Sequence, residues 1–379
     1  MKILFIIPGY SIGGTLSSLI NLLEILKRKN SLNINIDIFA ISPEGSYRDT
    51  LTKYGKVLSG GNSISGDSSF NMAVLVRKVK RFLSKLGVDI TPFVFRRTAR
   101  KLEGNKYDIV IGFQEGYATH LTSYFKNTCK IAWIHCDYKN YLRLIKSEPE
   151  YRCYNKIDKV VCVSKYTLQQ FRDCINHRNA TYIYNTILDD RIKIKAEEQI
   201  EDIDFPDSKF IIVSVGRLHP VKQFNKIPVI ISFLKRKGIK DFVWYLIGGG
   251  NDEVMNQIHQ EKMKYDAEEL ILLGEKNNPY PYIKQADLMV CTSLSEACPY
   301  AIIESKVLNV PVVTTNFGSA TEFITNGFDG YVEPIETIAD KIGLMINDTQ
   351  MYHVIKDNVR GFEYDNDKII NKIEQLLCL

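Results

Sequence analysis

Residues 210–222 read Phe-Ile-Ile-Val-Ser-Val-Gly-Arg-Leu-His-Pro-Val-Lys. The first six form an almost continuous apolar run rich in β-branched side chains, and a glycine follows the run. Runs of this kind are typical of strands that helices cover on both faces, as in parallel sheets. The stretch therefore predicts a buried parallel strand over 210–215, with Arg217 and Lys222 just beyond its carboxyl end.

Similar apolar runs recur along the chain and alternate with amphipathic stretches of helical period. We predict further strands over 2–7, 35–40, 109–112, 130–134, 159–163, 181–184, 242–247, 270–273, 288–291 and 310–314. Helical patterns lie between the runs, for example over 15–29 and 299–308. This alternation of strands and helices predicts an α/β fold with doubly wound parallel sheets.

The chain has 379 residues, which is enough for two domains of ordinary size. The alternation is interrupted once, over 189–209, where the sequence is charged and has no apolar period. We interpret this stretch as a linker between a Rossmann-like domain over 1–190 and a second one over 205–364. Two such sheets facing each other would form a cleft between the carboxyl ends of their strands, where open α/β sheets bind ligands.

Composition excludes several classes of protein. Apolar residues make up 45% and charged residues 25%, which excludes a disordered, collagen-like or coiled-coil chain. No apolar run is long enough for a transmembrane helix, and the run at Ile3–Ile7 is too short for a signal peptide, so we expect a cytoplasmic protein. The eight cysteines form no Cys-x-x-Cys motif, and the net charge of +5 permits anionic partners without identifying one.

Two loops at predicted strand ends suit a phosphate group. Arg217 and Lys222 are five residues apart and can converge on one diphosphate, the first as a fork and the second as a point charge. They could also be two solvated basic residues. The loop Pro8–Gly14 is rich in glycine and precedes a helix, whose first N–H groups can bind an anion, although an ordinary strand-to-helix turn would have the same composition.

A third loop, Ser295-Glu-Ala-Cys-Pro-Tyr-Ala-Ile-Ile-Glu304, follows the predicted strand 288–291. Pro299 suits the first turn of a helix, which would direct the N–H groups of Tyr300 and Ala301 toward the cleft. Glu296 and Glu304 are too far apart for an acid–base pair across one bond, but they suit two hydrogen-bonding positions on an extended ligand. Ordinary helix charges are the alternative interpretation.

A histidine, His135, ends the predicted strand 130–134. A lone histidine is more often structural than catalytic, and a position at a strand end raises the odds of a functional role. The aromatic-rich stretch 133–154 could line a ligand cleft with its rings, and it could equally be core packing.

Together these motifs resemble the retaining glycosyltransferases of the GT-B fold, family GT4 (glycosyltransferase group 1), and in particular members that build cell-envelope polysaccharides. Glu296-x7-Glu304 is similar to the E-x7-E signature of that family, and Gly216-Arg217-Leu218-x3-Lys222 to its G-R-L-x3-K element. The segments Asn278–Asp287, Pro311–Thr315 and Asn326–Gly330 also fit. The resemblance is strong over 210–335 and looser over 1–190.

The resemblance implies a role for each matching residue. Arg217 and Lys222 would bind the diphosphate of a nucleotide-sugar, Glu304 the ribose, and Glu296 the sugar as a catalytic residue together with His135. The remaining donor-binding residues that it implies are Gly14, Glu275, Lys276, Cys298, Pro299, Tyr300 and Ala301. The last helix, 365–379, would cross back onto the first domain. Ala297 and Gln223 stand where the family commonly has glycine.

The implied reaction moves a sugar from a UDP- or GDP-sugar to a glycan or lipid-linked acceptor, in capsule, lipopolysaccharide or similar synthesis, with retained configuration. Arg217, Lys222 and helix N–H groups would stabilise the charge that develops on the leaving diphosphate. We expect no metal and no cofactor. The two Asp-x-Asp strings, at Asp202 and Asp365, are interpreted as part of the linker and as a helix cap.

Residues 75–106 are strongly basic and contain apolar residues at roughly helical spacing. A basic amphipathic helix suggests a peripheral contact with an anionic membrane surface, and the alternative is a solvated helix with an ordinary core face. Two other functions stay open: a nucleotide-sugar epimerase of the same architecture, and a catalytically silent protein that binds membrane or nucleic acid. We favour transfer and expect no nucleic-acid partner.

Overall fold

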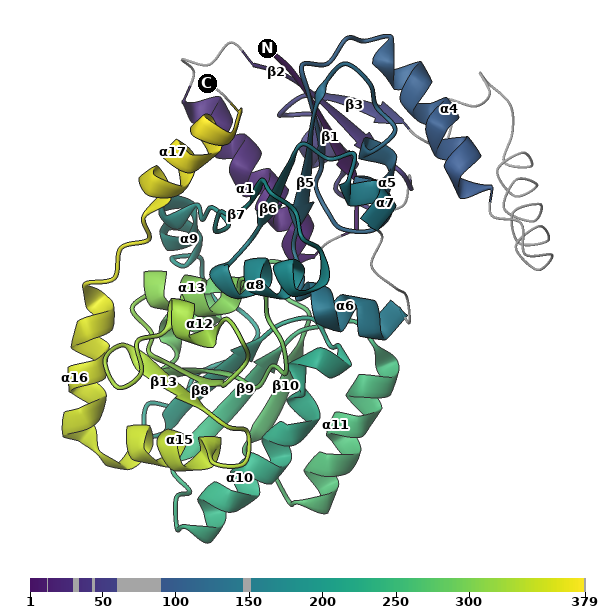
Figure 1. Cartoon of the computed structure of the whole chain (residues 1–379). Coiled ribbons are helices and arrows are strands. Elements are labelled where there is room, and N and C mark those ends of the chain that lie inside the picture. The colour runs from purple at the N-terminus through teal and green to yellow at the C-terminus, as the bar shows by residue number, and fades with distance from the viewer. Residues whose placement is uncertain (12, 30–33, 43–44, 60–89, 146–150, 378–379) are drawn as a thin grey trace. The chain divides into compact units, whose positions relative to one another are not determined.

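The computed structural model describes residues 1–11, 13–29, 34–42, 45–59, 90–145 and 151–377 (Figure 1). It divides into two compact units, Met1–Thr186 with Asp367–Leu379, and Ile187–Asn366. The division at residue 187 comes just before the charged stretch that the sequence analysis interpreted as the linker.

The first unit contains a parallel sheet whose described strands have the order β3-β2-β1-β4-β5-β6-β7. Its strands are β1 (Lys2–Ile7), β2 (Asn35–Ala40), β3 (Lys56–Ser59), β4 (Ile109–Gly112), β5 (Cys129–Ile134), β6 (Lys159–Cys162) and β7 (Ala180–Tyr182). Its helices are α1 (Gly14–Arg28), α2 (Arg48–Leu51), α4 (Thr91–Glu103), α5 (Tyr117–Thr122), α6 (Tyr138–Ile145), α7 (Tyr151–Tyr154), α8 (Lys165–Cys174) and α17 (Asn366–Leu377).

The second unit repeats this plan in the order β10-β9-β8-β11-β12-β13, again parallel throughout. Its strands are β8 (Phe210–Val215), β9 (Phe242–Ile247), β10 (Leu270–Gly274), β11 (Leu288–Cys291), β12 (Val312–Thr315) and β13 (Gly330–Glu333). Its helices are α9 (Asp189–Lys195), α10 (Ile227–Arg236), α11 (Asp252–Lys264), α12 (Tyr280–Gln285), α13 (Tyr300–Val307), α14 (Ala320–Phe323), α15 (Ile338–Asn347) and α16 (Thr349–Arg360). The prediction of two Rossmann-like α/β domains is confirmed.

The apolar runs form the inner strands and also the edge strands β7 and β10, whereas the two strands that the sequence analysis missed, β3 and β13, lie at the opposite edges of the two sheets. Strands β3 and β13 are the outermost strands of their sheets among the described residues. An edge strand pairs on one side only, so it can be short and need not read as a continuous apolar run. The predicted strand at 310–314 starts two residues late, at Val312, because Pro311 has no N–H to donate to a sheet.

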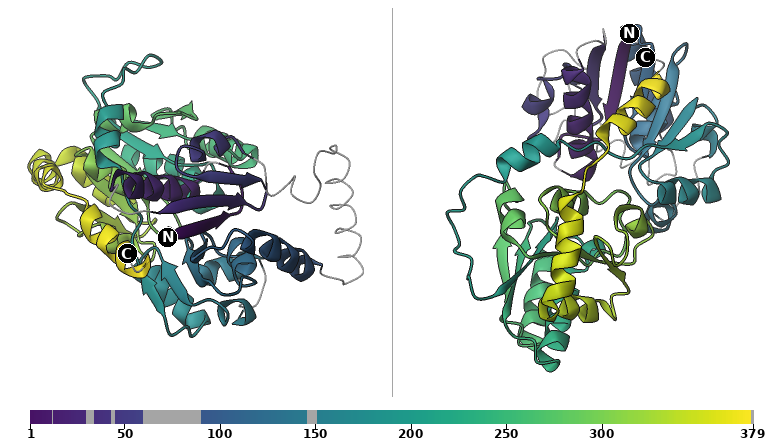
Figure 2. Two further views of the ribbon diagram at one scale, coloured as in Figure 1. Left: turned by 90° about the horizontal axis from the view of Figure 1, so that it is seen from above. Right: turned by 90° about the vertical axis from the view of Figure 1, so that its left-hand side faces the viewer.

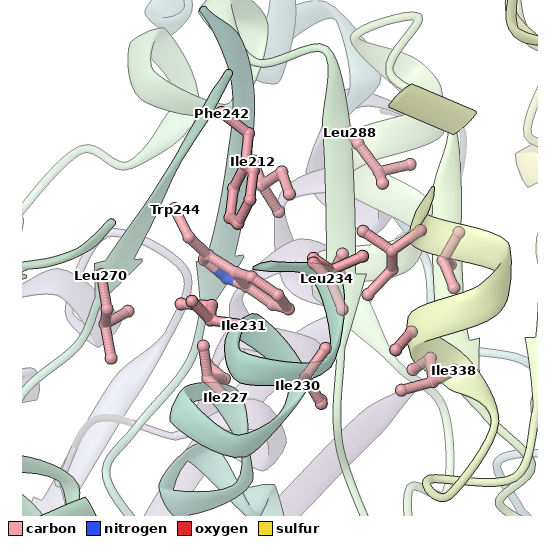
Figure 3. Packing of buried hydrophobic residues seen from close by; sticks show 14 of the residues in the cluster. Ile212, Ile227, Ile230, Ile231, Leu234, Phe242, Trp244, Leu270, Leu288 and Ile338 are labelled. Atoms are coloured by element: carbon pink, nitrogen blue, oxygen red, sulfur yellow. The ribbon is translucent and has the colours of Figure 1, made fainter. Parts of the chain in front are cut away.

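The core of the second unit lies between β8, β9 and α10 (Figure 3). Trp244 of β9 is fully buried against Ile231 and its helical neighbours. Its indole nitrogen donates to Ser214 Oγ at 3.0 Å, and Ser214 donates to the carbonyl of Val290 at 2.6 Å. This buried chain of hydrogen bonds ties β9 to β8 and β8 to β11, the pair of strands that carries the site described below.

The stretch interpreted as a linker is not extended throughout. Asp189–Lys195 forms helix α9, which has acidic residues in its first turn, buries Ile192, and contacts α12 and α13. Acidic residues favour a helix N-terminus, and one buried isoleucine is too little to produce an apolar period in the sequence.

Helix α17 packs on the first unit (Figure 2). Lys29 at the end of α1 pairs with Glu374 at 3.1 Å, and Lys159 donates to the carbonyl of Leu376 at 2.6 Å. Asn366, the first residue of α17, binds the backbone of Ile187: its side chain donates to the carbonyl of Ile187 at 2.7 Å and accepts from the N–H of Ile187 at 3.0 Å. The two chain segments at the unit boundary are therefore tied to each other.

Candidate functional site

In the second sheet, the strand order reverses between β8 and β11: β9 and β10 follow on one side of β8, and β11, β12 and β13 on the other. Loops at such a switch point diverge to opposite faces and leave room for a ligand at the carboxyl ends of the strands. The loops that follow β8 and β11 carry Arg217, Lys222 and Glu296. Thr292 Oγ1 donates to the carbonyl of Lys222 at 2.7 Å, and the N–H of Leu294 donates to that of Val221 at 2.7 Å, so the loops are held side by side.

Lys222 and Glu296 form an ion pair at the centre of this site. Lys222 Nζ lies 2.5 Å from Glu296 Oε1, and Ser293 Oγ donates to the same oxygen at 2.6 Å. The two charged side chains are 24% and 15% exposed. Burial alone would lower the pKa of Lys222, but the Glu296 carboxylate raises that pKa above its ordinary value, so Lys222 stays protonated.

Arg217 is the unneutralised charge of the site. It is exposed, and its guanidinium makes no hydrogen bond or ion pair with the residues that the structure describes. Burial and then the positive charges of Arg217 and Lys222 lower the pKa of His219. The loop after β8 is therefore a region of positive potential that suits a phosphate group.

Glycine makes the close approach of neighbouring loops possible. A Cβ added to Gly248, just after β9, would lie 1.9 Å from the carbonyl oxygen of Gly216, so a larger residue would push the loop after β8 away. The two residues that depart from the family pattern, Gln223 and Ala297, differ in backbone strain. Gln223 has a φ of 50°, the left-handed conformation that glycine favours, whereas Ala297 has no positive φ and is not strained.

Glu304 lies on α13 and meets a residue that the sequence analysis did not single out, Tyr280 of α12. The Tyr280 hydroxyl donates to Glu304 Oε1 at 3.0 Å. Burial raises the pKa of Glu304 to about 7, although the hydrogen bond from Tyr280 opposes this rise. The pKa of Tyr280 is raised by burial and then by the Glu304 charge, so Tyr280 remains the donor.

Helix α13 begins at Tyr300, with Pro299 as its N-cap residue rather than inside the first turn. Ala301, in that first turn, has no carbonyl four residues earlier within the helix to accept from its N–H. Cys298 and Pro299 are buried beneath this turn.

Glu275 and Lys276, both predicted to bind the donor, are placed differently from each other. Glu275 is exposed after β10 and lies against Gly249, where an added Cβ would come within 2.8 Å of its carboxylate. Lys276 pairs with Asp202 at 2.5 Å, and the Tyr282 hydroxyl donates to the same carboxylate. Lys276 is thus engaged by the segment after α9 and makes no described contact with Lys222 or Glu296.

The first sheet has its own switch point, between β1 and β4. Gly14 begins α1 after β1, and a Cβ there would meet open space, so the packing of the described residues does not itself require glycine at this position. His135 follows β5, the next strand. Burial lowers the pKa of His135 to about 3, and its buried Nε2 has no hydrogen-bond partner among the described residues. The imidazole is therefore neutral near neutral pH.

Glu115, which follows β4 at this switch point, is a residue that the sequence analysis missed. Its Oε2 accepts the N–H of His135 at 2.9 Å, and no basic side chain in the described part of the chain pairs with it. Burial raises the pKa of Glu115, although backbone hydrogen bonds from His135 and from Glu115 itself oppose this rise. The available signal was an acidic residue just past a predicted central strand, followed by glycine.

The aromatic stretch 133–154 is mostly core. Tyr138, Tyr154 and Phe171 are fully buried and pack edge to face on one another. Tyr151, in contrast, is half exposed. The packing interpretation therefore holds for Tyr138 and Tyr154.

No group of three or more histidine, cysteine, aspartate or glutamate residues suited to a metal ion occurs among the described residues. Asp202 is occupied by Lys276 and Tyr282, as given above. No helix in the described parts of the chain combines the length and apolar character needed to cross a membrane. Of the basic stretch 75–106, residues 75–89 lie outside the described residues, and most of the rest forms α4.

Two family models match the chain, one in each half. Residues 12–191 match the model described as "Glycosyltransferase Family 4", and residues 195–362 match "Glycosyl transferases group 1".

Among curated relatives, a UDP-Gal:alpha-D-GlcNAc-diphosphoundecaprenol alpha-1,3-galactosyltransferase of Escherichia coli is 25% identical over 45% of this chain and 44% of its own length. An N-acetylgalactosamine-N,N'-diacetylbacillosaminyl-diphospho-undecaprenol 4-alpha-N-acetylgalactosaminyltransferase of Campylobacter jejuni is 29% identical over 65% of this chain and 62% of its own length. The chain therefore spans less than two thirds of each of these relatives.

Among solved structures, Anabaena HepE in complex with UDP-glucose superposes with a TM-score of 0.72 at 18% identity, over 100% of this chain and 99% of that one. TarM of Staphylococcus aureus superposes with a TM-score of 0.72 at 16% identity, over 99% of each chain. At these identities the likeness supports the two-domain fold.

Proposed function

The chain belongs to the GT-B glycosyltransferases of family GT4, and from this premise we propose that it transfers a sugar from a nucleotide-sugar to a glycan or lipid-linked glycan in cell-envelope polysaccharide synthesis. The observation that carries the proposal is the arrangement at the switch point of the second sheet. There, an unneutralised Arg217 accompanies the Lys222–Glu296 pair.

The proposed reaction uses this arrangement in two states. Without donor, Glu296 neutralises Lys222. When a nucleotide-sugar binds, its diphosphate takes Lys222 and Arg217, and Glu296 accepts hydrogen bonds from the sugar hydroxyls. The bond between the sugar and the β-phosphate oxygen breaks, an acceptor hydroxyl oxygen forms the new bond to the same sugar carbon, and the hydroxyl proton passes to the leaving β-phosphate oxygen. The two cations and the N–H groups at the start of α13 stabilise the negative charge that develops on the leaving diphosphate.

We place the other predicted residues around the same donor. Glu304 would accept the ribose hydroxyls, and the loop after β10 with Glu275 would lie near the base. His135 and Gly14 would face the donor from the first unit. Because His135 is neutral, it would act by hydrogen bonding rather than as a cation. The configuration at the transferred carbon would be retained, which rests on the Glu296-x7-Glu304 resemblance.

A UDP-sugar is our preferred donor. The E. coli relative is named for UDP-Gal, and HepE was solved in complexes with UDP and with UDP-glucose. The acceptors named for the two curated relatives are sugars on diphosphoundecaprenol, which supports a lipid-linked acceptor here.

A thermal-shift panel of UDP, GDP, ADP and their common sugars tests the donor, with the chain kept in EDTA. We expect stabilisation by UDP and a UDP-sugar, at a level of about 2.7 kcal/mol when the ligand is at roughly 100 times its dissociation constant. Because Arg217 and Lys222 would neutralise the negative charge of the diphosphate, neither this stabilisation nor turnover should fall in EDTA. A loss that Mg²⁺ or Mn²⁺ restores would contradict metal-independent transfer, and no shift with any nucleotide would contradict transferase function.

We also propose that α4 contacts an anionic membrane surface. Its buried face contains Phe95, and its outward face presents Phe93, which is 69% exposed, beside three exposed arginines, Arg96, Arg97 and Arg100. Tyr117 at the start of α5 is also exposed, next to the ring of Phe95. Arginine with an exposed aromatic ring is typical of a surface that binds lipid headgroups.

Sedimentation with vesicles of phosphatidylglycerol or of phosphatidylcholine tests this surface. We expect binding to the anionic vesicles only, weakened roughly 100-fold by replacing Arg96, Arg97 and Arg100 with glutamine, at about 1 kcal/mol per charge. The matched control removes three exposed charges from the second unit, at Arg236, Lys240 and Lys264. No binding at low salt would reject membrane contact, and equal losses in both variants would reject α4 as its site.

A further inference from the structure

The contact between Tyr280 and Glu304 joins two helices that the sequence analysis treated separately. Tyr280 is the first residue of α12, Glu304 lies in α13, and their oxygens are 3.0 Å apart. Glu304 is only partly exposed. Among the described residues, the Tyr280 hydroxyl is the one group that donates a hydrogen bond to this carboxylate, and no basic side chain pairs with it.

Among the described residues, no charged group on the surrounding elements forms an ion pair with Glu304. On α9, Asp189 and Lys193 pair with each other, and Arg191 acts electrostatically on Tyr280. On α12, Lys284 pairs with Glu197. On α13 itself, Lys306 pairs with Asp329 in the interior. The strands beside α13, β11 and β12, carry no acidic or basic residue. Tyr280 is therefore what holds the Glu304 carboxylate.

We propose that Tyr280 is a positioning residue of the nucleotide site, whose hydroxyl favours the charged form of the Glu304 carboxyl group and orients it to accept both ribose hydroxyls. The inference rests on the proposed function, which assigns Glu304 to the ribose. A carboxylate only accepts hydrogen bonds, whereas a protonated carboxyl must place its own donor on one side. Nucleotide binding is therefore coupled to the charge of Glu304.

The sign of the pH dependence follows from this coupling. The pKa of Glu304 is about 7 in the folded chain, so the accepting form gains population as the pH rises through neutrality. We expect nucleotide-sugar affinity to rise over the same range. Removal of the Tyr280 hydroxyl takes away a hydrogen bond that stabilises the charged form, so the midpoint should move up by about one pH unit.

Isothermal titration with UDP-glucose and with GDP-mannose over a pH series from about 5.5 to 9 measures the midpoint. Nucleotide-sugars are suitable because the sugar blocks the terminal phosphate. A free terminal phosphate titrates near pH 6 and would obscure the result. Tyr280→Phe should shift the midpoint upward and reach parent affinity at high pH. Glu304→Gln should bind with no inflection. Tyr282→Phe is the matched control, since it removes a hydroxyl from the same helix that bonds Asp202 instead.

A ligand-free measurement keeps the inference testable if affinity is low. Between the ordinary value of 4.5 and about 7, folded Glu304 holds a proton that the unfolded chain has lost, so unfolding becomes easier as the pH rises. The melting temperature of Glu304→Gln minus that of the parent should therefore be more positive near pH 8 than near pH 5. For Tyr280→Phe the same difference should be more negative near pH 8 than near pH 5.

The outcomes separate the two claims. If neither nucleotide-sugar binds at high pH, the proposed function fails, and the inference fails with it. If a nucleotide-sugar binds but Tyr280→Phe leaves both the binding midpoint and the pH dependence of melting unchanged, only the positioning role of Tyr280 is rejected. An equal shift in Tyr282→Phe would also reject it.

Discussion

A chain with Arg217→Ala and Lys222→Ala is expected to keep its fold and to show none of the stabilisation that a nucleotide-sugar gives the parent. Arg217 has no described protein partner, so its removal costs the empty chain little. Lys222 is paired, but its partner Glu296 keeps the hydrogen bond from Ser293 at 2.6 Å and retains access to water. The folded structure should therefore tolerate both changes.

The effect on binding is much larger. Truncating one charged, hydrogen-bonded side chain in a desolvated site costs about 2–5 kcal/mol, so truncating two weakens diphosphate binding by roughly 10³-fold or more. A ligand at about 100 times the parent dissociation constant would then give almost no shift in melting temperature. The measurement is the thermal-shift series on both chains.

Arg236→Ala/Lys240→Ala is the control for this double variant. Both residues are exposed in the same unit, so the net charge falls equally without change at the switch point. Stabilisation of the Arg217/Lys222 variant that matches the parent would place the diphosphate elsewhere and would contradict the assignment.

The inner strands were predictable because burial on two faces imposes a continuous apolar run, as at Phe210–Val215. The edge strands β3 and β13 were not, since pairing on one side relaxes that demand. Helix α9 was hidden in a charged stretch because it buries a single isoleucine, Ile192. In each case the sequence signal scales with the apolar surface that the element buries.

The convergence of Arg217, Lys222 and Glu296 was predictable for a different reason. In a parallel sheet the carboxyl ends of the strands share one edge, so a motif at each strand end suffices. The partners of these residues were not predictable. Lys276 is engaged by Asp202, 74 residues earlier in the chain, and Tyr280 meets Glu304 across two helices. Such pairings depend on how helices pack, which no local pattern records.

Glu115 and His135 show the same limit in the first unit. A strand-end histidine can be read from the sequence, but its ionisation state cannot. Burial beside Phe113, whose ring centroid is 4.7 Å away, keeps the His135 imidazole neutral, and Glu115 holds its backbone N–H. His135 therefore does not contribute an inflection near pH 7 to nucleotide binding, whereas Glu304, with a pKa of about 7, can.

Replacing Glu296 by glutamine is expected to lower turnover by about 10²–10³-fold while UDP itself binds within a few-fold of the parent. Lys222 and Ser293 both donate to Glu296 Oε1, and Oε2 has no hydrogen bond with the described residues. The second oxygen is therefore available to a sugar hydroxyl. Glutamine has one oxygen and one N–H₂ group, so it would lose either the hydrogen bonds with the loop or an acceptor for the sugar, together with the negative charge.

A graded series distinguishes this role of Glu296 from a structural one. Ser293→Ala keeps the carboxylate but removes one of the two hydrogen bonds that orient it, so it should reduce turnover by only about tenfold, the worth of one such bond. Single-turnover rates with UDP-sugar and titrations with UDP give the two readouts. UDP contains no sugar beyond its ribose, so its affinity reports only on how the diphosphate and nucleoside are bound. A parallel loss of UDP affinity and turnover in Glu296→Gln would mean that Glu296 only holds Lys222 in place, whereas unchanged turnover would remove Glu296 from the reaction altogether.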